Sequence, residues 1–326
     1  MKIGNLEFKN GIALAPMAGF SDRAMRVVCH ELGAEYSVTE MVSAKAVVYG
    51  DKKTHLLSRI MADEGSVGLQ IFGSEPSVMA EAAGVLSEGE PGCARTVMMD
   101  INMGCPVPKI FSNGEGSALM KNPALIYDIV RSVKSAITIP LGVKLRLGVD
   151  RAHINAVECA LAAESAGADL ITVHGRTRVE MYMGNADYQE IEKVKKALHI
   201  PLVANGDVTD FDSYLRIKNE TGADGVMIGR GAVGNPFVFQ EIITALEKRE
   251  YTEPTLEEKV DVALRQLRLA IEDKGERAAI PESRKQIASY LHSFRGAAAI
   301  RARINQATEY LQIEKILTDA LRDESV

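Results

Sequence analysis

Hydrophobic and polar positions follow one repeated pattern over most of the chain. From residue 12 to about residue 248, a short apolar run ends in glycine or a polar turn, and an amphipathic stretch of about 10 to 15 residues follows. The apolar runs predict buried β-strands, and the amphipathic stretches predict α-helices. The predicted strands are residues 12–16, 35–39, 67–72, 97–102, 141–145, 170–174, 202–205 and 225–228. The predicted helices are residues 22–32, 76–86, 123–135, 152–166, 188–198, 210–220 and 236–248, with short helix and loop expected over 41–61.

Strands that alternate with helices predict parallel pairing and right-handed crossovers. Eight such units within about 235 residues fit a closed (β/α)₈ barrel, or TIM barrel, better than an open doubly wound sheet. The same turn recurs as Ala-Gly-Ala-Asp at 166–169 and Thr-Gly-Ala-Asp at 221–224, as a quasi-symmetric barrel would repeat it. The expected fold class is therefore α/β.

The pattern changes after residue 248, where a charged linker with Pro254 leads into helical periodicity alone. We expect helices at 256–273, 282–294 and 296–321. The predicted organisation is a barrel domain over residues 1–248 and an appended all-helical domain over residues 249–326.

Composition and charge narrow the classes of protein that this pattern allows. The chain has 326 residues, of which 46% are hydrophobic and 25% charged, and its net charge is −6. A polyanionic partner must therefore be held by a local basic patch. The four widely spaced cysteines form no C-x-x-C pair, which predicts reduced thiols in a cytoplasmic protein and no metal site. No apolar run resembles a signal peptide or a membrane span, so no membrane association is expected.

The strongest chemical signal is the stretch DINMGCPVPK at residues 100–109. An apolar strand turns polar at its carboxyl end and continues into Gly104, Cys105 and Pro106. Gly104 allows unusual backbone angles, and Pro106 prevents a helix from starting at Cys105. We therefore expect the thiol on a turn past a strand end, where catalytic groups of parallel α/β folds lie. The alternative is a buried cysteine that acts as a small apolar side chain.

Glycines follow the seventh and eighth predicted strands, in NGD at 205–207 and GRG at 229–231. Their backbone N–H groups predict a phosphate cradle, to which Arg230 adds a charge. Tight strand-to-helix turns are the alternative. The position of both motifs late in the strand order favours phosphate, because TIM barrels commonly bind it after strands seven and eight.

Three further side chains are predicted to face the same site. Lys144 lies within an apolar strand, where a lone charge is costly unless it meets an anion, although it could be a solvated lysine at the strand end. The amide of Gln70 suits the edge of a heterocycle or could serve loop packing. His174 could bind a ligand or be a satisfied core histidine. With Cys105, these groups fit an FMN oxidoreductase, but also a phosphate-sugar lyase or isomerase with a Schiff-base lysine.

At these positions the chain resembles the tRNA-dihydrouridine synthase family. The resemblance is carried by APMAGFSD at 15–22, NMGCP at 102–106 and HGRT at 174–177. Further matches in the same order are LQIFG at 69–73, VKLR at 143–146, NGD at 205–207 and GR at 229–230. The resemblance covers nearly the whole barrel, and the helical tail fits the family's RNA-binding domain more loosely.

The resemblance implies an enzyme that reduces the C5–C6 bond of particular uridines in tRNA, with tightly bound FMN and with NADPH as a transient reductant. Cys105 is implied as the proton donor to C5, and a thiol suits this role because its ordinary pKa of about 8.5 keeps it protonated. The residues implied to bind FMN are Pro16, Met17, Ala18, Gln70, Lys144, His174, Asn205, Gly206, Asp207, Gly229 and Arg230. The barrel residues implied to contact flavin or RNA are Arg146, Arg176 and Arg178.

Basic residues gather in the middle of the tail. Residues 277–303 hold six basic residues and one acidic residue, whereas residues 249–326 together hold 13 basic and 14 acidic residues. A phosphate-facing stripe has this distribution, with an ordinary solvated helix face as the alternative. The predicted RNA contacts are Arg284, Lys285, Arg295, Arg301 and Arg303. Tyr290 and Phe294 are the only aromatic residues in this stretch, which leaves the target uridine open.

Two other functions are compatible with the residues. One is an FMN-dependent reductase of a free pyrimidine or another small molecule, as dihydroorotate dehydrogenases are, although the basic tail argues against it. The other is a non-catalytic barrel that binds phosphate or RNA. No Gly-x-Gly-x-x-Gly fingerprint follows a predicted strand, so NADPH is expected to visit the flavin transiently. A monomer is expected.

Overall fold

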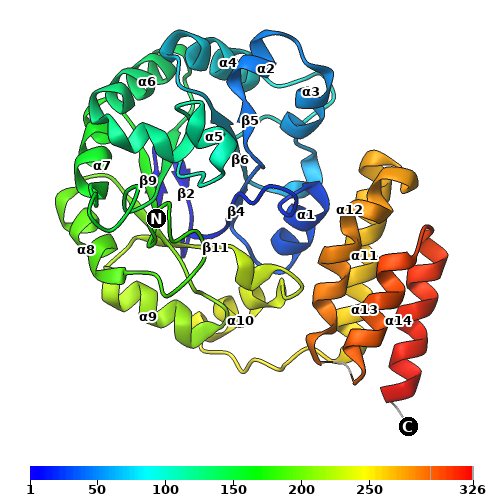
Figure 1. Cartoon of the computed structure of the whole chain (residues 1–326). Helices are drawn as coiled ribbons and strands as arrows, with labels where there is room; N and C mark the ends of the chain where they lie inside the picture. Colours follow the sequence, from blue (N-terminus) through cyan, green and yellow to red (C-terminus); the bar gives the residue numbers. More distant parts are fainter. Residues whose placement is uncertain (294, 325–326) are drawn as a thin grey trace.

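The computed structural model shows a closed barrel of eight parallel strands with a helical bundle at its side (Figure 1). It describes residues 1–293 and 295–324, without the side chains of residues 52, 53, 55, 292, 293, 323 and 324. The barrel strands are β3 (Ile12–Leu14), β4 (Tyr36–Val38), β6 (Val67–Phe72), β7 (Met98–Met103), β8 (Leu141–Leu145), β9 (Leu170–His174), β10 (Leu202–Asn205) and β11 (Gly225–Ile228). They pair in this order, and β11 pairs with β3 to close the barrel. The predicted TIM barrel is confirmed.

Helices cover the outside of the barrel between successive strands. They are α1 (Arg23–Glu31), α4 (Pro76–Glu88), α6 (Pro123–Ala136), α7 (Ala156–Ser165), α8 (Tyr188–Ala197), α9 (Phe211–Thr221) and α10 (Phe237–Leu246). The side chains of Asp22, Asp187 and Asp210 cap the first turns of α1, α8 and α9. Helix α7 begins later than the predicted residue 152, because residues 148–154 form a turn that an antiparallel bridge between Gly148 and Ile154 closes.

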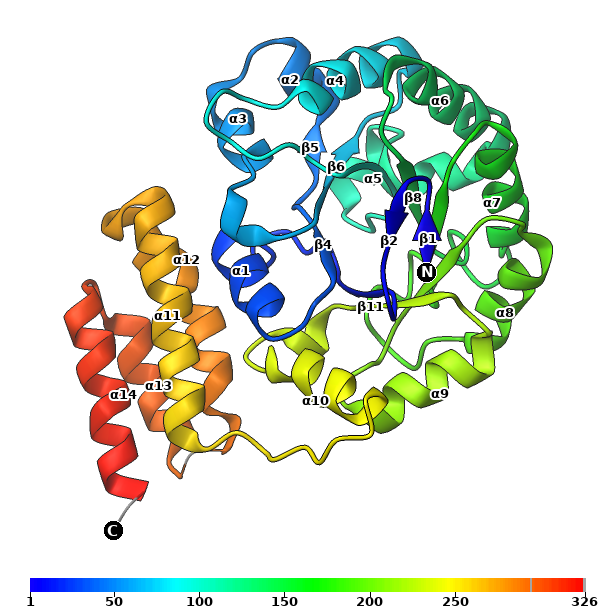
Figure 2. The same ribbon diagram turned by 180° about the vertical axis from the view of Figure 1, so that it is seen from behind.

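Several short elements were not predicted individually. They are β1 (Lys2–Ile3), β2 (Leu6–Glu7), β5 (Val42–Ser43), α2 (Ala44–Val48), α3 (Lys52–Ser58) and α5 (Pro108–Ser112). The hairpin of β1 and β2 covers the amino-terminal end of the barrel (Figure 2), where the rings of Phe8 and Tyr36 lie 4.7 Å apart. Elements this short depend on tertiary contacts, which sequence periodicity does not report.

Inward-facing side chains change from apolar to polar along the barrel axis. Met98 and Leu170 belong to an apolar cluster at the amino-terminal end, beneath the hairpin. Alternate positions of a strand face the same side, so Asp100 and then Asn102 follow Met98 on the inner face of β7. On β9 the last inward position is His174. Polar groups therefore converge at the carboxyl ends of the strands, where the active sites of TIM barrels lie.

The described part of the tail forms four α-helices, so the prediction of three is wrong. They are α11 (Leu256–Lys274), α12 (Glu276–Ser289), α13 (Ala297–Gln306) and α14 (Tyr310–Glu324). Helix α12 begins directly after Gly275, whose φ of 78° lets the chain turn sharply. Helices α13 and α14 separate because Ala307 is extended and its carbonyl accepts hydrogen bonds from the Arg284 side chain. Phe294, at the end of the predicted helix 282–294, lies outside the described residues.

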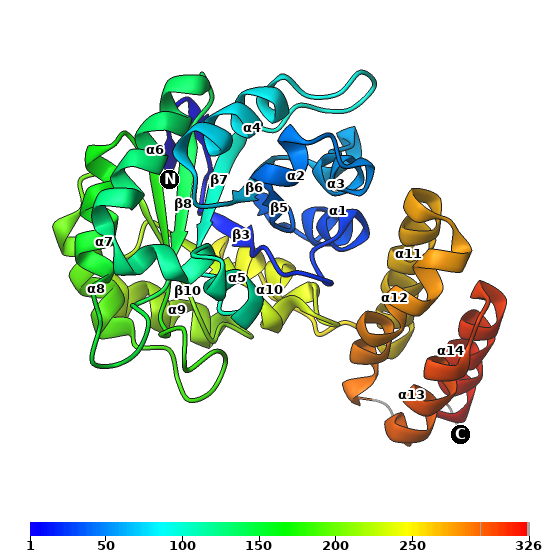
Figure 3. The same cartoon turned by 45° about the horizontal axis from the view of Figure 1, so that its top comes forward.

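The tail has an apolar core of its own and also packs against the barrel. Leu267, Ile287, Ile304 and Leu317 bring the four helices together around this core. Helix α11 lies against α1, as Figures 1 and 3 show, and Leu269 of α11 joins the core of the barrel. The bundle is therefore held on one side of the barrel by buried apolar surface.

Polar contacts add to this junction, and most of them reach the loop that follows β3. Arg265 pairs with Glu31 of α1, and Lys274 pairs with Asp22 at 2.9 Å. From α12, Gln286 donates a hydrogen bond to the Gly19 carbonyl at 3.3 Å, and Lys285 lies over the Phe20 ring at 4.7 Å. The tail thus contacts the loop that follows β3, at the mouth of the barrel.

Candidate active site

Cys105 lies on a turn immediately past the end of β7. Its N–H donates to Asn102 Oδ1 at 2.9 Å, and its carbonyl accepts a hydrogen bond from the Ser117 hydroxyl at 2.7 Å. Gly104 does not have a left-handed backbone, so the expectation of unusual angles is wrong. A side chain at this position would press against the backbone of Leu145 at 3.3 Å. Close packing between β7 and β8 therefore requires the glycine.

The Cys105 side chain lies just inside the protein surface, with 9% of the residue exposed. Burial raises the pKa of its thiol above the ordinary value, while the Val107 N–H and the nearby Arg146 guanidinium act in the opposite direction. The thiol is therefore protonated at neutral pH. Arg146 is also placed to stabilise the thiolate that remains after a proton has left.

A chain of buried hydrogen bonds runs from inside the barrel to this turn. Gln70 Nε2 donates to Asp100 Oδ2 at 2.7 Å, and Asn102 Nδ2 donates to Gln70 Oε1 at 2.8 Å. Asn102 Oδ1 accepts hydrogen bonds from the N–H groups of Gly104 and Cys105. Gln70 is thus buried with each end of its amide engaged once, and it is linked to the Cys105 turn through Asn102, while its contact with the flavin stays a prediction. Asp100 was missed, although a carboxylate in an apolar strand signals such a role.

Lys144, His174 and Asn205 come together from β8, β9 and β10. Lys144 Nζ donates to Asn205 Oδ1 at 3.1 Å. Burial lowers the pKa of Lys144 to about 8, Arg146 adds to this effect and Asp100 opposes it. Burial also lowers the pKa of His174 well below its ordinary value, and the neighbouring cations add to the shift. The imidazole is therefore neutral at pH 7, while the lysine is close to its titration range.

Arg146 and Arg176 are buried and hold the loop between β9 and α8 at the barrel mouth. Arg146 donates to the carbonyls of Gly104 and Thr177, each at 2.8 Å. Arg176 is 1% exposed and donates to the Met183 carbonyl at 3.0 Å and to Asp207 at 2.8 Å. These partners leave neither guanidinium facing solvent, where RNA would lie. In this structure both arginines hold the loop, and their contact with flavin or RNA stays a prediction.

Aromatic side chains accompany the arginines at the rim of the mouth. Tyr182 is 52% exposed, and the Arg230 guanidinium lies 5.0 Å from the centre of its ring. The imidazole of His174 lies 6.4 Å from the same ring. Arg178 is partly buried and lies over the Phe111 ring at 3.9 Å. Sequence reasoning missed Tyr182, although an aromatic residue in the loop after a barrel strand was a usable signal.

The turns after β10 and β11 place a backbone bend and a positive charge where the phosphate cradle was predicted. Gly206 has a φ of 144°, and a side chain there would lie 2.6 Å from Ala186, so both conformation and space require glycine. Asp207 accepts hydrogen bonds from Arg176 and from the Ala186 N–H. The Arg230 side chain is 55% exposed and lies 3.4 Å from Asp207. Asp207 is thus engaged by the protein, and Arg230 is the cation that remains accessible.

The loop after β3 forms the neighbouring part of the mouth. Pro16 and Met17 are partly buried and Ala18 is exposed, and the Met17 N–H donates to the Ser21 hydroxyl at 2.8 Å. A side chain added to Gly229 would lie 3.5 Å from the Met17 sulfur. The predicted flavin-contacting loop and the glycine after β11 therefore lie against each other at the carboxyl ends of two neighbouring strands.

Two of the predicted RNA contacts in the tail line one hollow. Lys285 of α12 and Arg301 of α13 border a space of about 370 Å³, together with Ser289 and Asn305. The hollow lies beside the junction with the barrel, because Lys285 also contacts Phe20. Two cations on adjacent helices therefore face a common space near the barrel mouth.

The other predicted contacts in the tail lie apart from this hollow. Arg284 is turned inward and donates to the Ala307 carbonyl. Arg303 lies 3.8 Å from Asp319 of α14. Arg295 is exposed. The predicted stripe is therefore divided, and Arg284 serves the packing of the bundle.

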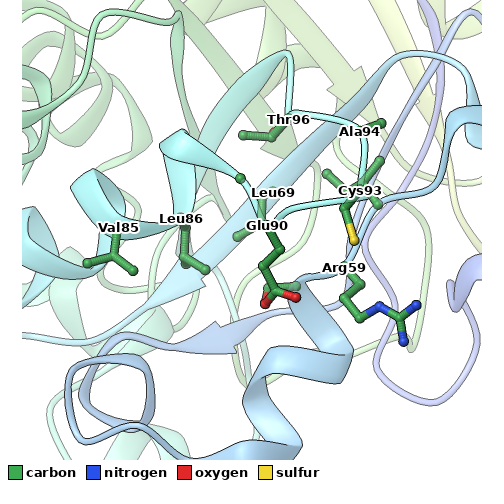
Figure 4. Close-up of a pocket in the computed structure, with 11 residues that line it drawn as sticks. Arg59, Leu69, Val85, Leu86, Glu90, Cys93, Ala94 and Thr96 are labelled. Atoms are coloured by element: carbon green, nitrogen blue, oxygen red, sulfur yellow. The ribbon is translucent and has the colours of Figure 1, made fainter.

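The described part of the chain has further features away from the barrel mouth. A cavity of about 90 Å³ lies near the end of α4, lined by Leu69, Leu86, Cys93, Thr96 and neighbouring residues (Figure 4), and it holds none of the predicted site residues. Among the side chains that the structure describes, no three metal-ligating groups gather as a metal ion would require. The described helices include none that is long and apolar enough to cross a membrane.

A closed parallel barrel that gathers a thiol, a lysine and glycine-rich turns at its strand ends defines a TIM-barrel enzyme. Solved structures with the same fold include a 2-naphthoyl-CoA reductase, at 14% identity and a TM-score of 0.56 over 76% of this chain and 52% of that one. A histamine dehydrogenase from Rhizobium sp. 4-9 matches at 13% identity and a TM-score of 0.58, over 82% and 50% of the two chains. At these identities the likeness concerns the fold alone.

The sequence identifies the family within this class. Residues 13–324 match the model of the dihydrouridine synthase (Dus) family. Similar proteins include a probable tRNA-dihydrouridine synthase of Rickettsia conorii, 36% identical over 98% of this chain and 96% of that protein. A tRNA-dihydrouridine synthase B of Shewanella oneidensis is 39% identical over 89% of each chain. The chain therefore belongs to the dihydrouridine synthase family, and the predicted family and class of oxidoreductase are confirmed.

Proposed function

We propose that this chain reduces the C5–C6 double bond of particular uridines in tRNA, with FMN as its flavin and NADPH as the external reductant. The observation that carries the proposal is the protonated thiol of Cys105, held on a turn at the barrel mouth beside Arg146. Family membership supports a flavin cofactor and tRNA as the substrate. On this proposal the protein is a cytoplasmic monomer that NADPH visits transiently.

The groups around the mouth fit a bound flavin mononucleotide. Met17 and Gly229 border the opening from β3 and β11, where a flat ring could lie. Lys144 is partly buried with a lowered pKa, so an electron-rich ring edge would stabilise its charged form. Arg230 and the turn at Gly206 are placed for the ribityl phosphate, and His174 and Asn205 would donate or accept hydrogen bonds as neutral groups. Pro16, Ala18 and Asp207 would complete the contacts as part of these loops.

Bound reduced FMN supplies a hydride to C6 of the uracil, and the protein supplies the proton for C5. As negative charge develops on the uracil, the Cys105 thiol transfers its proton to C5, which completes the saturated bond. The resulting thiolate is stabilised by Arg146 and the Val107 N–H, the two groups that already lower the pKa of this thiol. Asn102 keeps the thiol in place, because its Oδ1 accepts a hydrogen bond from the N–H of Cys105.

The uracil must leave any base stack to reach this thiol, because the site is recessed at the strand ends. The exposed ring of Tyr182, beside Arg230, offers a surface against which an extruded base can stack. Lys285 and Arg301 are placed to hold phosphates of the same tRNA at the side of the mouth. Arg178 and Arg295 are further proposed contacts.

Anaerobic reduction of the purified protein, followed by addition of unmodified tRNA, tests this function directly. We expect a yellow protein whose reduced flavin is reoxidised by tRNA, with dihydrouridine appearing in the RNA. Reoxidation by free pyrimidines and not by tRNA would assign the barrel to a small-molecule reductase. A colourless protein that cannot be reconstituted with FMN would contradict the proposal as a whole.

A further inference from the structure

We propose that Asp100 is a positioning residue for Cys105, because its carboxylate sets the direction of the hydrogen-bond chain through Gln70 and Asn102 that holds the Cys105 turn. The inference deepens the proposed function and rests on it, since it takes Cys105 as the proton donor. Asp100 is 2% exposed and makes no hydrogen bond to the thiol, so it reaches the Cys105 turn through the chain of hydrogen bonds.

The barrel makes a specific place for this carboxylate. Gln70 and Asp100 are partners in the register between β6 and β7. On the other side, β8 carries Gly142, where a side chain would lie 2.6 Å from Asp100 Oδ1. Burial raises the pKa of Asp100 to about 6, while Gln70 and Lys144 lower it, so the group is mostly ionised at pH 7. A neutral side chain would be less costly to bury here, which indicates a role other than stability.

An ionised carboxylate imposes a direction on the side chains bonded to it. It can only accept hydrogen bonds, whereas the amides of glutamine and asparagine have a donor end and an acceptor end. Gln70 must therefore present Nε2 to Asp100 and Oε1 to Asn102. Asn102 must in turn present Nδ2 to Gln70 and Oδ1 to the turn.

The last link in this chain fixes the turn that carries the thiol. Asn102 Oδ1 accepts from the N–H of Gly104 at 3.2 Å and from that of Cys105 at 2.9 Å. If the two amides were reversed, the NH₂ group of Asn102 would face two backbone N–H groups, and these buried donors would lose their acceptor. The turn would then be released, and the thiol would no longer be held at a fixed distance from the uracil.

Asp100→Asn tests this role, because asparagine has nearly the same shape but can donate as well as accept. We expect kcat for uridine reduction to fall by about ten- to a hundredfold, the cost of a slightly misplaced catalytic group. The KM for tRNA should stay unchanged. Alkylation of Cys105 by iodoacetamide, followed at that peptide by mass spectrometry, should become several times faster, and the melting temperature should not fall.

Glu64→Gln is the matched control, since Glu64 is equally buried but pairs with Arg26 outside the chain of hydrogen bonds. This variant should lower the melting temperature and leave the alkylation of Cys105 unchanged. The proposal is overturned if Asp100→Asn keeps the wild-type alkylation rate, or if it only loses stability as Glu64→Gln does. Faster alkylation in Asp100→Asn, combined with full activity of Cys105→Ala, would leave the positioning role standing and disprove Cys105 as the donor.

Discussion

At the residue scale, burial prepares the ionisable groups of the barrel mouth for different tasks. It keeps the Cys105 thiol protonated, makes His174 neutral and brings the pKa of Lys144 to about 8. These shifts arise because a low-dielectric environment disfavours the charged form of each group. The barrel mouth therefore combines three kinds of group. Cys105 is a protonated acid, His174 is a neutral hydrogen-bonding ring, and Lys144 is a cation with a lowered pKa.

Cys105→Ala removes the proposed proton donor and little else. Flavin binding and NADPH oxidation should survive, while uridine reduction falls by about two to four orders of magnitude, the usual weight of general acid catalysis. Single-turnover oxidation of the reduced flavin by tRNA measures this loss. Cys93→Ala is the control, because this thiol lines the separate cavity near α4. A fully active Cys105→Ala enzyme would show that another group supplies the proton.

Lys144→Met tests whether the lysine is kept at a cost to stability. A charged Lys144 is disfavoured in the folded state, since its pKa of about 8 lies below the value of about 10.4 in an unfolded chain. The penalty is therefore complete below pH 8 and disappears as the pH rises towards 10.4. Lys144→Met should raise the melting temperature of the flavin-free protein at pH 7, with a smaller gain at pH 10.

The same variant should bind FMN more weakly, as a fluorescence titration would show. Lys218→Met is the control, because Lys218 also has a pKa lowered by burial but donates to the carbonyls of Ala223 and Asp224, away from the mouth. It should leave FMN affinity unchanged. Wild-type FMN affinity in Lys144→Met would remove Lys144 from the cofactor site.

At the scale of elements, the loop between β9 and α8 depends on two buried arginines. Arg146 reaches it from β8, and Arg176 holds its far end through the Met183 carbonyl and Asp207. The loop carries Tyr182, the exposed ring at the rim. Strand β9 therefore ends at His174, but side-chain hydrogen bonds from Arg146 and Arg176 hold the loop beyond it, including the residues proposed to contact the substrate.

Arg176→Met should lower the free energy of unfolding by about 2 kcal/mol, because it takes a buried guanidinium away from the Met183 carbonyl and from Asp207, which keeps only the longer contact with Arg230. Denaturant unfolding measures this loss, and hydrogen exchange should show faster exchange over residues 177–184. Arg178→Met removes only the interaction of a cation with the Phe111 ring and should cost less than about 1 kcal/mol. An equal loss of unfolding free energy in the two variants would contradict the assignment of Arg176 as the residue that holds the loop.

At the scale of the whole molecule, the barrel and the tail share one surface. The chain is acidic overall, but Lys285 and Arg301 face a common hollow beside the loop of Phe20. The net charge of the chain therefore does not account for the binding of a polyanion. The cations that lie near the barrel mouth account for it better.

Replacing both Lys285 and Arg301 with alanine should weaken tRNA binding and reduce the slope of log K against log salt by about two, or one for each phosphate that is no longer bound. The flavin spectrum should not change. Arg303→Ala should reduce the slope less than either single variant of the pair, because Arg303 lies beside Asp319. An unchanged slope in the double variant, measured by filter binding from low to physiological salt, would show that the hollow does not face RNA.

The sequence by itself determined the barrel, the family and the stretch that carries Cys105. Hydrophobic periodicity reports which segments are buried, and eight strand-and-helix units leave few ways to close a sheet. Glycine and proline report turns, because their restrictions are local to the backbone. For the same reason, the position of Cys105 past the end of β7 followed from a few neighbouring residues.

Only the tertiary structure decided what each polar side chain does. Arg146 was predicted to contact flavin or RNA, yet its side chain is buried against the carbonyls of Gly104 and Thr177. Gln70 and Asp100 meet because β6 and β7 pair in one register, and a shift of one residue would turn Asp100 outwards. Helices α13 and α14 separate where Arg284 of α12 binds the Ala307 carbonyl. Such partners are far apart in the chain, so no local pattern records them.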